Sequence, residues 1–195
     1  MKLMLFSLLL SVLVGYLLGG RLSNVSTIRL RWTGLAVAGF ALQFVSGPGT
    51  AIPLTCLYSS FVLLTIFAVK NVRIVGFPLI LVGIALNFTV IGSNLGMPVA
   101  RQALEASGQA DTLEGLIHNP YPKHHLASSD DLVVFLGDVI AVPKPVGQAI
   151  SIGDIFTYGG VAVVIAAGMR APVGRREEEV PGMPDDRGEV QHAGG

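Results

Sequence analysis

Five long apolar runs limit the folds open to this chain more than any other feature. They cover residues 3–20, 28–45, 51–69, 74–92 and 152–169. About 20 apolar residues in an α-helix cross a hydrocarbon core of about 30 Å, and each run approaches that length. We therefore expect an all-α fold, an integral membrane bundle of five transmembrane helices, with residues 1–169 forming one membrane domain.

Composition agrees with a membrane protein. Hydrophobic residues make up 51% of the chain and charged residues only 13%, whereas globular proteins carry about 25% charged residues. A soluble domain of this composition would expose large apolar patches. The formal net charge of zero argues against nucleic acid as a partner, because such proteins need a basic surface.

The first apolar run has a competing interpretation as a cleaved signal peptide, because Lys2 precedes it. A single lysine is a weak n-region, and residues 16–20 make a poor cleavage site. We therefore expect the run to be retained as a transmembrane helix.

The distribution of basic residues predicts how the bundle is oriented. One side of the five spans receives Arg21, Arg29, Arg31, Lys70, Arg73, Arg170, Arg175, Arg176 and Arg187, and the other receives Lys2, Arg101, Lys123 and Lys144. The richer side normally faces the cytoplasm. We expect a multi-pass protein of the cytoplasmic membrane with its N-terminus and residues 93–151 outside. Residues 170–195 contain too little apolar sequence to fold and are expected to form a disordered cytoplasmic tail.

The extracytoplasmic segment 93–151 holds most of the polar residues outside the tail and is too varied in sequence to be disordered. Pro98 predicts the start of a short helix, and residues 119–122 (Asn-Pro-Tyr-Pro) predict a rigid turn. The apolar run 132–136 is too short to span a bilayer. It is expected to form an interfacial or re-entrant turn.

Two residue pairs in this segment match the pattern of a helix capping box. Ser128 precedes Asp131 by three residues, and Ser151 precedes Asp154 by the same spacing at the start of the last apolar run. A Ser hydroxyl and a carboxylate at this spacing satisfy free backbone N–H groups at a helix start. We expect structural roles for all four residues.

The remaining polar residues of the segment are candidates for chemistry. His124 and Asp138 are the candidate catalytic residues, acting as an acid–base pair or as metal ligands. His118, His124 and His125 are the weak candidates for metal ligands, joined by the aspartates at 130, 131 and 138. Their spacing matches no metal motif, and adjacent histidines point in different directions, so we expect no metal and no cofactor. Arg101, Lys123 and His124 are an alternative site for an anion or a lipid headgroup.

Polar residues inside the predicted spans are few. Gln43 and Asn87 are expected to form hydrogen bonds between helices, and Gly34, Gly39 and Gly83 allow close helix packing without forming a dimer motif. No charged residue lies in the middle of a span. This argues against a transporter of protons or ions.

The chain resembles a family of small bacterial multi-pass membrane proteins of unknown function. The resemblance is carried by Asn94-Leu95-Gly96-Met97-Pro98, Lys123-His124-x-Leu126, Phe135-Leu136-Gly137-Asp138 and Ser151-x-Gly153-Asp154, and it covers about residues 1–169. It implies a five-helix membrane topology and no particular activity.

From these features we expect a non-enzymatic accessory or binding protein of the cell envelope. Its expected partners are the lipid bilayer and either a lipid headgroup or another membrane or envelope protein. The alternative is a membrane enzyme that acts on an envelope substrate through a His/Asp site in residues 118–138. A small-solute transporter is the third possibility.

Overall fold

The computed structural model describes residues 2–45, 51–118 and 123–170. Its elements are α1 (Lys2–Leu17), η1 (Leu22–Thr27), α2 (Thr33–Leu42), α3 (Ala51–Lys70), α4 (Phe77–Asn94), β1 (Met97–Val99), α5 (Arg101–Ser107), α6 (Ala110–His118), β2 (His124–Leu126), η2 (Val134–Leu136), β3 (Ile140–Val142), β4 (Gln148–Ile150) and α7 (Ile152–Arg170). The expected turn at 119–122 and residues 171–195 of the expected tail lie outside the described residues, whereas Arg170 is the last residue of α7.

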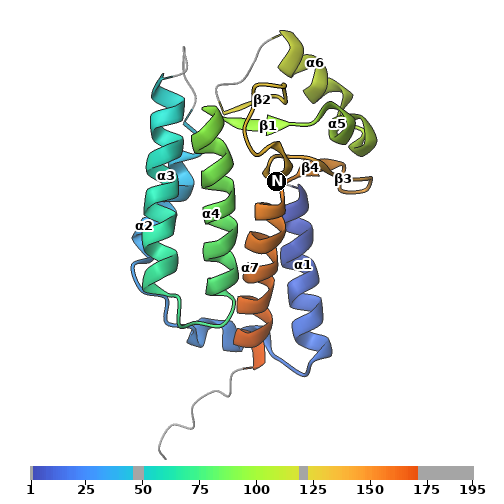
Figure 1. Cartoon of the computed structure of the whole chain (residues 1–195). Helices are drawn as coiled ribbons and strands as arrows, with labels where there is room; N and C mark the ends of the chain where they lie inside the picture. Colours follow the sequence, from blue (N-terminus) through green and yellow to red (C-terminus); the bar gives the residue numbers. More distant parts are fainter. Residues whose placement is uncertain (1, 46–50, 119–122, 171–195) are drawn as a thin grey trace, which may run out of the picture.

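The chain is mainly helical, and its long helices stand side by side in the order α2, α3, α4, α7, α1 (Figure 1). Consecutive helices run in alternating directions. We call residues 95–151 the cap segment; its described residues, 95–118 and 123–151, lie together at the end of the bundle where α4 ends and α7 begins. The cap segment is therefore held at one end of the bundle.

Three helices are long and apolar enough to cross a membrane, namely α3, α4 and α7. The two other apolar helices are shorter, with 16 residues in α1 and 10 in α2. At 1.5 Å per residue they extend for about 24 Å and about 15 Å, less than a hydrocarbon core of about 30 Å. The structure thus supports three spans by length and composition, where the sequence predicted five.

The predicted second span, 28–45, forms a helix only over Thr33–Leu42. Asn71 pairs with the Arg31 backbone, accepting from its N–H at 2.8 Å and donating to its carbonyl at 2.9 Å. Trp32 then takes a left-handed conformation with φ of 61°, which a helix cannot contain. Residues 28–32 of the predicted span are consequently non-helical. The centroid of the Trp32 ring lies 5.1 Å from Lys70 Nζ.

Glycines allow α4 and α7 to pack at very short range. A Cβ atom added to Gly83 would lie 2.5 Å from the Gly153 carbonyl oxygen, and one added to Gly160 would lie 2.7 Å from the Gly76 carbonyl oxygen. Gly76 and Gly83 are seven residues apart, as are Gly153 and Gly160. The glycine contact between the helices is therefore repeated after about two helical turns. Small residues at such contacts permit close approach in membrane helices.

Polar side chains join the same two helices where they meet the cap segment. Asn87 donates to Asp154 Oδ1 at 3.0 Å, and it accepts from Ser151 Oγ at 2.8 Å. Ser151 and Asp154 also exchange the two hydrogen bonds of a capping box, at 2.9 and 3.3 Å. These contacts fix the first turn of α7 against α4.

The cap segment contains short strands that the all-α prediction did not include. β1 pairs in parallel with β2, and β3 pairs antiparallel with β4. Val99 on β1 also forms a parallel bridge with Asp138, so β1 lies between two neighbours. α5 and α6 pack on this arrangement through a separate apolar core of Val99, Ala103, Leu104, Leu116 and Ala149.

The glycine contact between α4 and α7 makes a direct prediction. Gly83→Ala forces the two helices apart, and we expect it to destabilise the protein by about 1–3 kcal/mol, the usual cost of overpacking. The matched control is Gly92→Ala in the same helix, where an added Cβ meets no atom within 4 Å. Thermal unfolding in mild detergent measures both. Equal midpoints for the two variants would contradict the close packing.

Candidate functional site

A cavity of about 730 Å³ opens in the cap segment between α5–α6 and the β3–β4 hairpin. It is lined by Val99, Leu104, Ser107, Gly108, Gln109, Asp111, Thr112, Leu116, His124, Asp138, Lys144, Pro145, Gly147, Gln148 and Ala149. Apolar side chains of the cap core and uncharged polar side chains thus share its wall. Two of the residues singled out from sequence, His124 and Asp138, both line it.

The short strands explain why His124 and Asp138 line the same cavity. β1 lies between β2 and the strand-like residue Asp138, with Asp138 N–H donating to the Pro98 carbonyl at 3.0 Å and Ala100 N–H to the Asp138 carbonyl at 3.1 Å. Side chains alternate between the two faces of a strand. His124 and Val99 therefore project on one face, and Asp138, bridged to Val99, projects on the same face. This face lies against the cavity.

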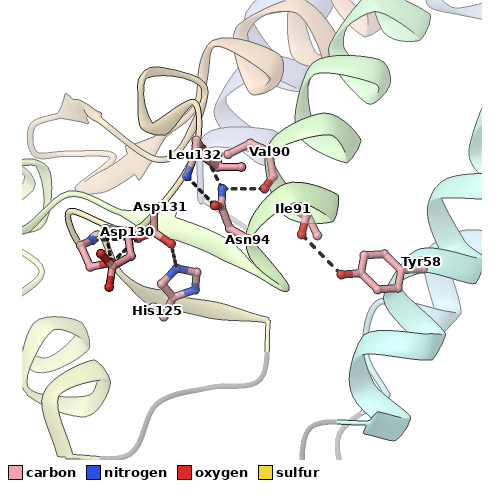
Figure 2. Close-up of polar contacts among 9 residues, drawn as sticks. Tyr58, Val90, Ile91, Asn94, His125, Asp130, Asp131 and Leu132 are labelled. Carbon is pink, nitrogen blue, oxygen red and sulfur yellow. Dashed lines mark hydrogen bonds and ion pairs between the residues drawn. The ribbon is translucent and has the colours of Figure 1, made fainter.

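The next residue along β2 takes the opposite face. His125 Nε2 lies 2.9 Å from Asp131 Oδ1, as Figure 2 shows, and His125 does not line the cavity. Asp131 Oδ2 accepts from the backbone N–H of Ser128 at 2.7 Å. The Ser128–Asp131 pair therefore closes a turn after β2, and no α-helix follows it.

Asp131 is stabilised in its charged form. Burial acts to raise its pKa, but the Ser128 N–H and the His125 ring outweigh burial and leave the pKa lowered. The charged Asp131 carboxylate therefore stabilises the turn most strongly at pH values above the ordinary pKa range of a carboxylate. This stabilisation is lost in strong acid, where the carboxylate is protonated.

The side walls of the cavity are tied together by Gln109. Its Oε1 accepts from Ala149 N–H at 2.6 Å and from Ser107 Oγ at 3.1 Å. The turn between α5 and α6 is thereby bonded to β4. Lys144 and Asp111 stand exposed at the cavity, and neither forms an ion pair within residues 2–45, 51–118 and 123–170.

The two inner titratable groups are shifted toward their uncharged forms. Burial, and to a smaller extent the nearby Asp154 carboxylate, raises the pKa of Asp138 to about 8. Burial lowers the pKa of His124, and the charges of Lys123 and His125 add to this effect, while Asp154 opposes it. The His124 side chain is solvent-exposed and lines the cavity. Near pH 7 these shifts favour a protonated Asp138 carboxyl and a neutral His124 imidazole, both of which line the cavity.

The proposed anion site is not assembled in this arrangement. Lys123 Nζ donates to the carbonyls of Gln43 and Val45, the latter at 2.7 Å, and so binds the cap segment to the end of α2. Burial lowers the pKa of Lys123, and the nearby Cys56 opposes that effect. Arg101 is exposed on α5 and does not line the cavity.

The candidate metal ligands also remain apart. His118 is exposed at the end of α6, and His125 is paired with Asp131. In the part of the chain that the structure describes, no group of three or more His, Cys, Asp or Glu side chains could hold one metal ion. Of the candidate residues, only His124 and Asp138 line the cavity.

Apart from His124 and Asp138, sequence patterns did not identify the residues of the cavity walls. Gln109, Gln148 and Lys144 belong to no motif. Their shared position arises from the packing of α5–α6 against the β3–β4 hairpin, which local spacing does not encode.

The raised pKa of Asp138 predicts a pH-dependent stability. Because the folded chain holds this proton more tightly than the unfolded chain, the stabilisation is complete below about pH 4 and is lost as the pH rises through about 8. We expect Asp138→Asn to remove this decline, whose slope is at most about 1.4 kcal/mol per pH unit. Thermal unfolding in detergent across this range measures it. Asp130→Asn, at an exposed carboxylate, is the control and should keep the decline; an unchanged decline in Asp138→Asn would contradict the burial of a protonated carboxyl.

Comparison with known proteins gives a family but no activity. A family model described as "Family of unknown function (DUF5317)" matches residues 27–166, from the end of η1 into α7. No curated protein and no solved structure matches the chain. The matched range includes all of the cap segment and its cavity. The chain therefore belongs to the family of unknown function DUF5317.

Proposed function

We propose that this protein is a membrane-embedded binding protein that holds a small polar molecule in the cavity of its cap segment on the extracytoplasmic side. The observation that carries the proposal is the convergence of His124 and Asp138 on one cavity of about 730 Å³. Small-molecule sites are typically clefts of about 300–1,000 Å³ with mainly apolar walls and a few convergent polar groups.

The chemistry of the lining indicates the kind of ligand. A protonated Asp138 donates a hydrogen bond, and a neutral His124 can both donate and accept one. The exposed Lys144 and Asp111 add one charge of each sign at the cavity. A molecule with several hydrogen-bonding groups and little net charge suits this combination.

We further propose that α1 and α2 are embedded with the three longer helices, so that five helices alternate through the membrane. Their alternating directions and their packing beside α7 and α3 support this. The described basic residues at the end opposite the cap segment are Arg21, Arg29, Arg31, Lys70, Arg73 and Arg170. By the positive-inside rule that end faces the cytoplasm, with the N-terminus and the cap segment outside.

A second function uses the same cavity as an active site. His124 and Asp138 would serve as general base and general acid on an envelope substrate, since both line one cavity and their pKa shifts favour a neutral imidazole and a protonated carboxyl near neutral pH. We rank it below binding because the lining offers no activated nucleophile. Conversion of the bound molecule during incubation would distinguish the two.

Transport and partner binding have less support. The cavity lining includes neither Gln43 nor Asn87, and Asn87 is engaged by Asp154 and Ser151 between α4 and α7. A route through the bundle would have to break that contact. Binding of another envelope protein remains a proposal that rests on the exposed cap segment alone.

Blocking the cavity tests the binding proposal. Thr112 lines the cavity on α6, whereas Glu114 is exposed two residues later and does not line it. Thr112→Trp fills the space, and we expect it to reduce retention of the bound molecule by at least about tenfold, a loss of about 1.4 kcal/mol. Mass spectrometry of small molecules extracted from protein purified in mild detergent measures retention. The control Glu114→Trp should match the wild type, and equal retention in all three proteins, or none, would overturn the proposal.

The orientation is tested by reporter fusions. A fluorescent protein fused after Arg170 should fold and fluoresce, and a phosphatase that works only outside the cytoplasm should be inactive there. The same phosphatase inserted at Gly108 in the cap segment should be active. The reverse pattern would rule out the proposed orientation.

A further inference from the structure

Four large apolar side chains of the cap segment are exposed next to the end of α4 and in the turn that Asn94 binds. Their relative exposures are 67% for Leu95, 62% for Leu132, 37% for Val133 and 62% for Phe135. We call these residues the apolar patch. Leu95 directly follows α4, and the other three lie in the turn and short helix η2 that precede Asp138.

Hydrogen bonds fasten the turn of this patch to the last turn of α4. Asn94 Oδ1 accepts from Leu132 N–H at 2.7 Å, and Asn94 Nδ2 donates to the Leu132 carbonyl at 2.9 Å (Figure 2). Asn94 Nδ2 also donates to the Val90 carbonyl within α4. One side chain thus satisfies both backbone groups of Leu132 and sets the turn at the level where α4 ends.

The length of α4 indicates where that level lies relative to a membrane core. α4 contains 18 residues and is apolar enough to span a membrane. At 1.5 Å per residue its length is about 27 Å, close to the hydrocarbon thickness of about 30 Å. A turn bonded to its last residue therefore meets the lipid near the headgroup boundary.

The backbone conformation also favours a role for the exposed side chains. Leu95 has φ of 55° and Val133 has φ of 48°, both in the left-handed region. Glycine or asparagine adopts this region with little strain, whereas a β-branched residue such as Val133 is a true outlier there. The chain carries apolar side chains at the two positions where small or polar ones would relieve strain.

We propose that the apolar patch inserts into the leaflet of the same membrane that α4 crosses, and so anchors the cap segment to the lipid surface. No lysine or arginine lies in the patch, and the charged residues beside it are Asp130 and Asp131. Asp131 is engaged by His125 and Ser128, and Asp130 is exposed in the turn that precedes Leu132. Insertion is therefore driven by apolar contact and needs no anionic lipid. This inference is independent of what the cavity binds.

A tryptophan at Phe135 tests the insertion directly. Trp32 is the single tryptophan of the chain, so Phe135→Trp in a Trp32→Phe background reports from one position. The full chain is reconstituted in phosphatidylcholine vesicles whose acyl chains are brominated near the headgroup. We expect blue-shifted emission and quenching at least about twofold greater than for Ser129→Trp in the same background, since interfacial side chains lie about 5–10 Å into the boundary.

Two further variants keep the experiment decisive. Leu132→Trp is a second reporter in the patch should Phe135→Trp fail to fold, as judged by gel filtration and circular dichroism. Ser129→Trp, in the exposed turn that precedes the apolar patch in the sequence, should emit at longer wavelength and be little quenched. Red-shifted, unquenched emission from both patch reporters would overturn the proposal. Blue-shifted emission without bromine quenching would also overturn it, because protein rather than lipid would then cover the patch.

Discussion

The close contact of α4 with α7 is the interaction on which the rest of the structure depends. The glycines at Gly83 and Gly153 bring the helices together, and Asn87 joins them by hydrogen bonds to Asp154 and Ser151 at the end nearest the cap segment. Since lipid offers no hydrophobic drive for helix association, such packing and hydrogen bonding must supply it. The cap segment begins at the end of α4 and ends at the start of α7, so this pair of helices holds both of its ends.

Separate contacts then hold the cap segment to the bundle. Lys123 donates to the carbonyl groups at the end of α2, and Asn94 binds the backbone of Leu132. Leu3 N–H at the start of α1 donates to Gln148 Oε1 on β4 at 3.3 Å. Three different helices thus contact three different parts of one segment. The cavity between its helices and hairpin is formed by a segment that is fixed at several points.

Position relative to the strands gives the neighbouring histidines different roles. His124 faces the cavity with Asp138, while His125 faces the other way and pairs with Asp131, because side chains alternate along β2. The burial that surrounds the first face raises the pKa of Asp138 to about 8. The pairing on the second face keeps the pKa of Asp131 low. Two carboxylates seven residues apart therefore differ in charge near neutral pH.

The sequence by itself determined that this chain is mainly helical and apolar enough for a membrane, because hydropathy and helix length are local properties. It also indicated His124 and Asp138 as residues to consider, since they had no structural role in the pattern. Only the tertiary structure decided that α2 is shorter than a full span, since the contacts of Asn71 with Arg31 join distant parts of the chain. It alone brought His124 and Asp138 to one cavity, because that meeting depends on strand pairings between residues far apart in sequence.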